Sequence, residues 1–151
     1  MSENLKKLVL KGVTPLDAGL TLDCGQSFRW SENKNGTWHG VAFGKSVDAF
    51  VDGDELIITG DVNENDEQLW RDYFDLNTDY GTICQNLCED KWLNKAISAY
   101  AGIRILKQEP WEALCSFIIS QNNNIPRIKG IIERLCATFG EKLSGGDYSF
   151  P

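Results

Sequence analysis

Three consecutive asparagines, Asn122, Asn123 and Asn124, are the residues of this chain best suited to contact something other than protein. They stand between two apolar runs with helical periodicity, and Pro126 follows them. Asn is poor inside a helix because its amide competes for backbone hydrogen bonds. An Asn directly before a helix can cap it, so we expect Asn124 to be an N-cap. One cap does not require three asparagines, and Asn122 and Asn123 are therefore expected to point outward.

Outward amides offer hydrogen bonds to polar edges, as in protein contacts with nucleic-acid bases. The start of the next helix adds unpaired N–H groups and a positive dipole end, which favour phosphate. Arg127 lies in that first turn, where a cation opposes the dipole, and this placement indicates an anionic or base partner. From the residues alone, a plain helical corner that binds nothing is the alternative.

A second candidate is the stretch CGQSFRW, residues 24–30. Gly25 is expected inside a strand, where its missing side chain would let a flat ligand approach the backbone. A bulge that curves the sheet is the competing explanation. Arg29 is expected to brace the structure.

The sequence gives little support for a metal, thiol or phosphate-loop catalytic site. His39 is the only histidine, and the five cysteines, at positions 24, 84, 88, 115 and 136, contain no CxxC pair. A metal site would need more soft ligands, so the thiols are expected to be reduced and packed as small hydrophobes. The sequence has no glycine-rich phosphate loop and no obvious nucleophile. We expect neither a metal nor a cofactor.

The elements that position these residues fall into two groups. Residues 5–60 are predicted to form an antiparallel meander of four or five strands, including a strand through residues 19–30, with hairpin turns at Asn35-Gly36 and Asp52-Gly53. Beyond residue 61 the apolar spacing becomes helical. Helices are predicted over residues 63–76, 80–90, 91–102, 110–121 and 126–139, the last ended by Gly140. A sheet followed by helices is an α+β fold.

Charge is distributed unevenly along the 151 residues, whose net charge is −7. The first 100 residues carry 9 Lys and Arg against 17 Asp and Glu, whereas residues 101–151 carry 6 against 5. A phosphate-facing surface is therefore expected in the last third. No run approaches the roughly 20 apolar residues of a membrane span. The apolar segment near the N-terminus is too short for a secretory signal. A cytoplasmic protein is expected, or a nuclear one in a eukaryote.

The two candidate stretches together resemble a known family. GQSFRW (25–30) followed about 90 residues later by SFIISQNNNIPRI (116–128) is similar to the 8-oxoguanine DNA glycosylase/AP lyase family. RILKQEPWEALCSFI, ERLCATFG and the terminal FP extend the resemblance over nearly all of the chain. It implies a base-excision repair enzyme that flips oxidised guanine out of double-stranded DNA and cuts its glycosidic bond. It also implies a TBP-like twisted antiparallel sheet domain over residues 1–101 and the start of the helical glycosylase domain over residues 102–151.

The resemblance also implies roles for individual residues. Gly25 matches a glycine whose carbonyl accepts the N7 hydrogen of 8-oxoguanine, and Asn122 matches an asparagine that fills the space left by the flipped base. Arg127 matches an arginine that reads the orphaned cytosine. Phe117 matches a phenylalanine near the lesion pocket, with core packing as an equal explanation. The remaining DNA-binding candidates are the neighbouring Asn123 and Asn124.

The family's catalytic lysine and aspartate lie in a helix–hairpin–helix region beyond the last residue of this chain, and no residue here matches them. We therefore expect an N-terminal part of a longer enzyme, inactive alone, whose partners are lesion-containing duplex DNA and the missing C-terminal helical half. A naturally short protein without catalysis is the alternative. It would act as a non-catalytic damaged-DNA-binding module, or as a protein-interaction domain that uses the acidic sheet.

Overall fold

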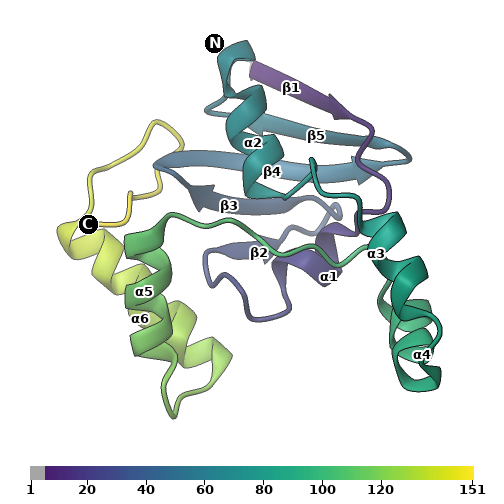
Figure 1. Ribbon diagram of the computed structural model, residues 1–151. Coiled ribbons are helices and arrows are strands. Elements are labelled where there is room, and N and C mark those ends of the chain that lie inside the picture. Colours follow the sequence, from purple (N-terminus) through teal and green to yellow (C-terminus); the bar gives the residue numbers. More distant parts are fainter. Residues whose placement is uncertain (1–5) are drawn as a thin grey trace.

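Residues 6–151 are described by a computed structural model. Five antiparallel strands form one sheet in the order β1-β5-β4-β3-β2, and helices follow along the chain (Figure 1). The strands are β1 (Lys6–Lys11), β2 (Trp30–Glu32), β3 (Trp38–Ala42), β4 (Lys45–Asp52) and β5 (Glu55–Gly60). The predicted α+β class is confirmed. β2 to β5 form a meander, and β1 pairs with β5 at the edge of the sheet opposite β2.

Both predicted hairpin turns are present. The β2–β3 turn contains Asn35 and Gly36, and the φ angle of Gly36 is +81°. Asp52 pairs with Glu55 across the β4–β5 turn, where Gly53 has φ +58°. Glycine occupies this left-handed region without the steric cost that a Cβ imposes, so these residues close the hairpins.

The strand predicted through residues 19–30 is wrong. Ala18–Leu22 forms the short helix α1, residues 23–29 form an irregular loop, and the strand begins only at Trp30. The carboxylate of Asp17 accepts a hydrogen bond from the backbone N–H of Leu20 at 2.8 Å and caps this helix. The N-cap at Asp17 therefore stabilises a helix here, although the apolar residues alternate as they would in a strand.

The remaining helices agree with the predictions apart from their ends. They are the 3-10 turn η1 (Glu64–Asp66), α2 (Glu67–Tyr73), α3 (Tyr80–Leu87), α4 (Lys91–Tyr100), α5 (Pro110–Ser120) and α6 (Ile125–Phe139). The helix expected over residues 63–76 is thus shorter, and α6 begins one residue before Pro126. Gly140 ends α6, its N–H donating to the carbonyl of Cys136 at 2.7 Å. Within residues 6–151, no helix has both the length and the apolarity to cross a membrane.

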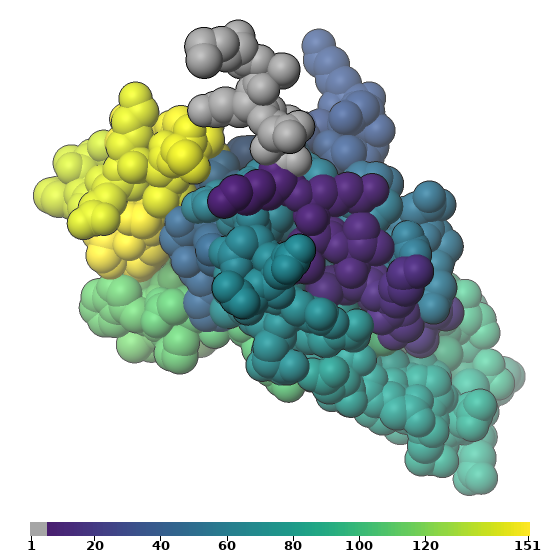
Figure 2. Space-filling model, turned by 90° about the horizontal axis from the view of Figure 1, so that it is seen from above, coloured from purple at the N-terminus to yellow at the C-terminus, as the bar shows by residue number. Residues whose placement is uncertain are grey.

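The main core lies between the sheet and α2. The indole N–H of Trp30 donates to the hydroxyl of Tyr73 at 2.7 Å, and the rings of Tyr73 and Phe74 meet edge to face. Burial raises the pKa of Tyr73, which keeps its hydroxyl neutral. A smaller second core forms where Ile128 and Ile132 of α6 pack against Phe28. By contrast, α3 and α4 bury no residue and project from the body as a separate lobe (Figure 2).

Arg104 fixes the extended segment between α4 and α5 to the main core. Its guanidinium donates to the backbone carbonyls of Asp75 (2.7 Å), Pro15 (2.9 Å) and Val13 (3.1 Å). It also lies over the ring of Tyr80, 4.6 Å from the centroid. The residue is only 2% exposed, so these carbonyls have little access to water as a substitute donor.

Replacing Arg104 with Met is expected to lower the free energy of unfolding by about 3 kcal/mol, because several buried carbonyls lose their donor. Urea unfolding followed by tryptophan fluorescence measures the change. Arg134→Met, on the exposed face of α6, is the control and should change stability by no more than about 0.5 kcal/mol. Equal effects of the two substitutions would contradict the structural role of Arg104.

Candidate nucleic-acid interface

The turn between α5 and α6 carries the three asparagines. The side chain of Asn124 accepts a hydrogen bond from the backbone N–H of Arg127 at 3.1 Å, in extended backbone with φ −114° and ψ 154°. Asn124 is therefore the N-cap of α6, as predicted. Its amide is committed to the helix, so its contribution to any bound partner is the orientation of the first turn.

Asn123 does not project outward as predicted. Its side-chain amide donates to the carbonyl of Ile119 at 3.1 Å, and its side-chain oxygen accepts from the N–H of Asn124 at 3.0 Å. The first bond ties the turn to the last part of α5, and the second lies within the turn itself. The Asn123 side chain thus binds a carbonyl near the end of α5 and an N–H just before α6, which have no partner within the helices. This is the physical reason that it turns inward.

Asn122 is the asparagine whose amide remains available. It is exposed, and within residues 6–151 its side chain forms no hydrogen bond. Its φ of +51° lies in the left-handed region, which Asn tolerates better than most residues. The side chain of Arg127 is also exposed, in the first turn of α6, and forms no ion pair with the described residues. Asn122 and Arg127 therefore present one amide and one guanidinium to solvent at the same corner.

The outer face of α5 is apolar. Trp111, Leu114, Phe117 and Ile118 are between 51% and 64% exposed, while Glu112 and Ser116 on the opposite side are buried. Phe117 therefore packs into neither core of the described residues. A helix with its apolar residues outside and polar residues inside is unusual for a solvent-facing surface, and it indicates that this face normally meets another surface.

Gly25 lies in the loop between α1 and β2. Its φ is +85°, and a side chain added there would meet nothing within 4 Å. Among the described residues, no group donates a hydrogen bond to its carbonyl oxygen. The predicted strand environment is thus wrong, but the consequence favours binding, because a carbonyl outside a sheet ladder remains able to accept a hydrogen bond from a ligand.

Gln26 anchors this loop. Its side chain donates to the carbonyl of Arg104 at 2.8 Å and accepts from the N–H of Leu106 at 3.0 Å. Its own carbonyl accepts from the side chain of Gln108 at 2.6 Å. The residue next to Gly25 is therefore fixed to the segment that leads into α5, so the exposed glycine is attached to a rigid neighbour.

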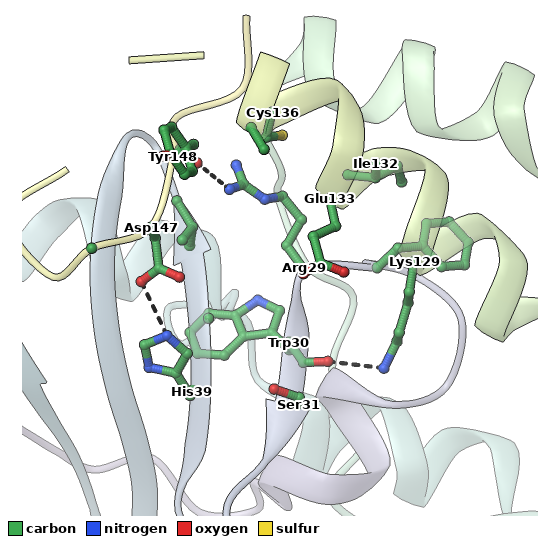
Figure 3. A pocket seen from close by; sticks show the side chains of 15 residues that line it. Arg29, Trp30, Ser31, His39, Lys129, Ile132, Glu133, Cys136, Asp147 and Tyr148 are labelled. Atoms are coloured by element: carbon green, nitrogen blue, oxygen red, sulfur yellow. Dashed lines mark hydrogen bonds and ion pairs between the residues drawn. The ribbon is translucent and has the colours of Figure 1, made fainter. Parts of the chain in front are cut away.

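A buried ion pair connects the loop to α5. The guanidinium of Arg29 lies 3.7 Å from the carboxylate of Glu112, and both side chains are nearly buried. Arg29 also donates to the carbonyl of Tyr148 in the C-terminal segment (Figure 3). Burial raises the pKa of Glu112, and the neighbouring Arg29 opposes that change. Arg29 thus braces the structure, as expected.

Lys129 on α6 was missed by sequence reasoning, as was the anchoring role of Gln26. The ammonium of Lys129 donates to the carbonyl of Trp30 at 2.9 Å and to the carboxylate of Asp23 at 3.2 Å. It borders a cavity of about 430 Å³ between α6 and the β2–β3 edge (Figure 3). No sequence signal identifies these contacts, because the paired residues are far apart in the chain.

Groups able to bind a metal are lacking in the described part of the chain, where no cluster of three or more His, Cys, Asp or Glu has suitable geometry. The five cysteines are free thiols. The single histidine is placed between two carboxylates, with Asp48 at 3.0 Å and Asp147 at 3.1 Å. The α5–α6 turn and the loop that carries Gly25 can instead form hydrogen bonds to a polar ligand.

Comparison with known proteins agrees with the resemblance seen in the sequence. The family model of the 8-oxoguanine DNA glycosylase N-terminal domain matches residues 8–114. The N-glycosylase/DNA lyase of Saccharomyces cerevisiae is 34% identical over an alignment of 151 residues, covering 86% of this chain and 39% of the yeast protein.

Solved structures superpose closely on this backbone. MBOgg1 in complex with a low-affinity DNA ligand has a TM-score of 0.91 at 42% identity, covering 100% of this chain and 55% of its own. The 8-oxoguanine glycosylase/lyase of Clostridium acetobutylicum in its apo-form has a TM-score of 0.91 at 40% identity, covering 97% and 53%. Its complex with double-stranded DNA containing cytosine opposite 8-oxoG has a TM-score of 0.87 at 37% identity, covering 99% and 54%.

This chain therefore spans about half the length of these solved relatives and a smaller share of the yeast protein. The family model covers most of its residues, and its sheet and helices coincide with those of the solved enzymes. The protein belongs to the 8-oxoguanine DNA glycosylase family.

Proposed function

We propose that this chain is the lesion-recognising part of a base-excision DNA glycosylase with AP lyase activity. Its substrate would be double-stranded DNA that contains 8-oxoguanine. The observation that carries the proposal is the carbonyl of the exposed residue Gly25, which has no donor among the described residues and belongs to a chain of this family. The names of the yeast and Clostridium relatives, N-glycosylase/DNA lyase and 8-oxoguanine glycosylase/lyase, support it.

The carbonyl of Gly25 would distinguish the lesion from guanine. 8-Oxoguanine carries a hydrogen on N7, whereas guanine has a lone pair there. A carbonyl accepts a hydrogen bond from the first and faces a repelling lone pair in the second, a difference of a few kcal/mol when water is excluded. The base must leave the stack to be inspected in this way.

Asn122 and Arg127 would act on the DNA that remains after the base is flipped. The amide of Asn122 is a neutral hydrogen-bonding group suited to the emptied position in the stack, and the guanidinium of Arg127 would read the orphaned cytosine. Phe117, exposed on α5, would lie beside the flipped base. Asn123 and Asn124 would contribute to DNA binding indirectly, by fixing the turn through their bonds to Ile119 and Arg127.

The catalytic lysine and aspartate would come from a C-terminal helical half. The exposed apolar residues of α5, together with Trp92 and Tyr100 of α4, support such a partner because they form surfaces that a soluble protein rarely leaves uncovered. The proposed division into residues 1–101 and 102–151 would place α5 and α6 in the helical domain, although Arg104 and Leu106 still pack into the main core. A protein that repairs DNA would act in the cytoplasm, or in the nucleus of a eukaryote.

The complete enzyme, meaning this chain joined to its helical half, is expected to release 8-oxoguanine from duplex DNA and to become covalently trapped by borohydride. The 151-residue chain alone should do neither, because no lysine or aspartate in it matches the catalytic pair. Base release is measured by chromatography and trapping by gel shift. Trapping of the chain alone would contradict the assignment of catalysis to the helical half, and lesion-selective binding without any cleavage by the complete enzyme would favour a non-catalytic binding module.

Gly25→Ala is expected to reduce the preference of the complete enzyme for 8-oxoguanine over guanine about tenfold, because a strained backbone displaces the inspecting carbonyl. Gly36→Ala is the matched control. Its φ of +81° is close to the +85° of Gly25, and neither added side chain meets an atom within 4 Å. Each should lower stability by about 1 kcal/mol. Single-turnover excision gives the preference, and an equal loss in both variants would contradict the role of Gly25.

Asn122→Gly combined with Arg127→Ala is expected to weaken binding to a duplex with an abasic analogue opposite cytosine at least about tenfold. Glycine keeps the left-handed backbone of Asn122 unstrained, so only the amide is lost. Fluorescence anisotropy at one fixed salt concentration measures affinity. The control, Asn86→Ala with Lys95→Ala on the α3–α4 lobe, likewise removes one exposed amide and one exposed positive charge. Similar weakening by both pairs would mean that the corner makes no specific contact.

A further inference from the structure

Lys129 joins both ends of the loop that carries Gly25. Asp23 begins this loop and Trp30 follows it, and the same ammonium donates to the Asp23 carboxylate at 3.2 Å and to the Trp30 carbonyl at 2.9 Å. The dashed line from Trp30 to Lys129 in Figure 3 marks the second contact. Because an ammonium has three donors, one side chain can hold two acceptors at once. The loop between them has no regular secondary structure of its own, so its shape depends on such contacts.

The same lysine belongs to the helix whose first turn carries Arg127. α6 is a continuous helix from Ile125 to Phe139. Two residues along a helix correspond to about 200° of rotation, so Lys129 faces the sheet while Arg127 remains exposed on another side. Lys129 is the only α6 side chain that hydrogen-bonds to residues 23–30 within the described chain.

We propose that Lys129 is a positioning residue that sets the Gly25 carbonyl relative to the start of α6. It would hold the Gly25 carbonyl and the start of α6 in a fixed relative position. The contact to the lesion and the contacts to the orphaned base could then form at the same time. The inference rests on the proposed function and adds a residue to it. The other polar anchors of the loop do not reach α6. Gln26 contacts the segment at residues 104–108, and Arg29 contacts Glu112 of α5 and the carbonyl of Tyr148.

The fold does not depend on this lysine. Its side chain is 30% exposed and that of Asp23 is 55% exposed, so their ion pair adds little stability in water. Phe28, which lies in the C-terminal part of the loop, packs against Ile128, Ile132 and Cys136 and keeps α6 in place without the lysine. Substitution of Lys129 should therefore leave a folded protein in which only the first part of the loop, from Asp23 to Gly25, is less well defined.

Lys129→Met tests the proposal in the complete enzyme, because methionine retains most of the aliphatic stem and cannot donate. The single-turnover rate of 8-oxoguanine excision opposite cytosine is expected to fall about tenfold, because a small misplacement of a group that positions the substrate slows the reaction. Affinity for a duplex with an abasic analogue, which has no base for Gly25 to inspect, should stay within about twofold. Lys129→Arg should recover most of the rate, and Lys34→Met in the β2–β3 turn should change neither quantity.

Loss of excision together with an equal loss of abasic-site affinity would overturn the proposal, because it would indicate a general effect on DNA binding or folding. Unchanged excision by Lys129→Met in an enzyme that excises normally would also overturn it, while leaving the proposed function intact. Failure of the unsubstituted enzyme to excise 8-oxoguanine would instead contradict the proposed function itself, and the inference with it.

Discussion

The buried guanidinium of Arg104 is the interaction on which the relation between sheet and helices depends. It donates hydrogen bonds to carbonyls in the segment after β1 and in the turn after α2, which are distant in the sequence. The backbone of the same residue accepts from Gln26 and donates to the hydroxyl of Thr21 at 3.2 Å. The loop that carries Gly25 is thus supported by the residue that closes the main core. The core and the candidate interface are thus joined at one residue, whose side chain holds the core and whose backbone holds the loop.

The sequence was informative wherever local chemistry decides the structure. Asn35-Gly36 and Asp52-Gly53 identify hairpins because a left-handed turn selects glycine, and Asn124 before Pro126 identifies a helix start. Local chemistry also explains the main error. The alternation of Leu20 and Leu22 suggested a strand, but Asp17 caps a short helix there. The order β1-β5 at one side of the sheet and the contacts of Gln26 and Lys129 join distant residues, and no spacing in the chain reveals them.

The asparagine triplet shows how far residue type can predict a site. All three residues were expected to lie at the corner, and all three do. Their side chains nevertheless form different contacts. Asn123 satisfies the end of α5, Asn124 satisfies the start of α6, and Asn122 alone remains exposed. Residue type limits what an amide can bind, whereas backbone conformation decides what it does bind.

The two edges of the sheet have a consequence for how the protein behaves at high concentration. An edge strand exposes N–H and C=O groups that can pair with another molecule and begin aggregation. β1 carries the exposed lysines Lys6, Lys7 and Lys11, whose charges repel an approaching copy, and β2 at the opposite edge is only three residues long. Neither edge is a long, flat, apolar template. A chain with so much exposed apolar helix surface is thereby protected against self-association through its strands.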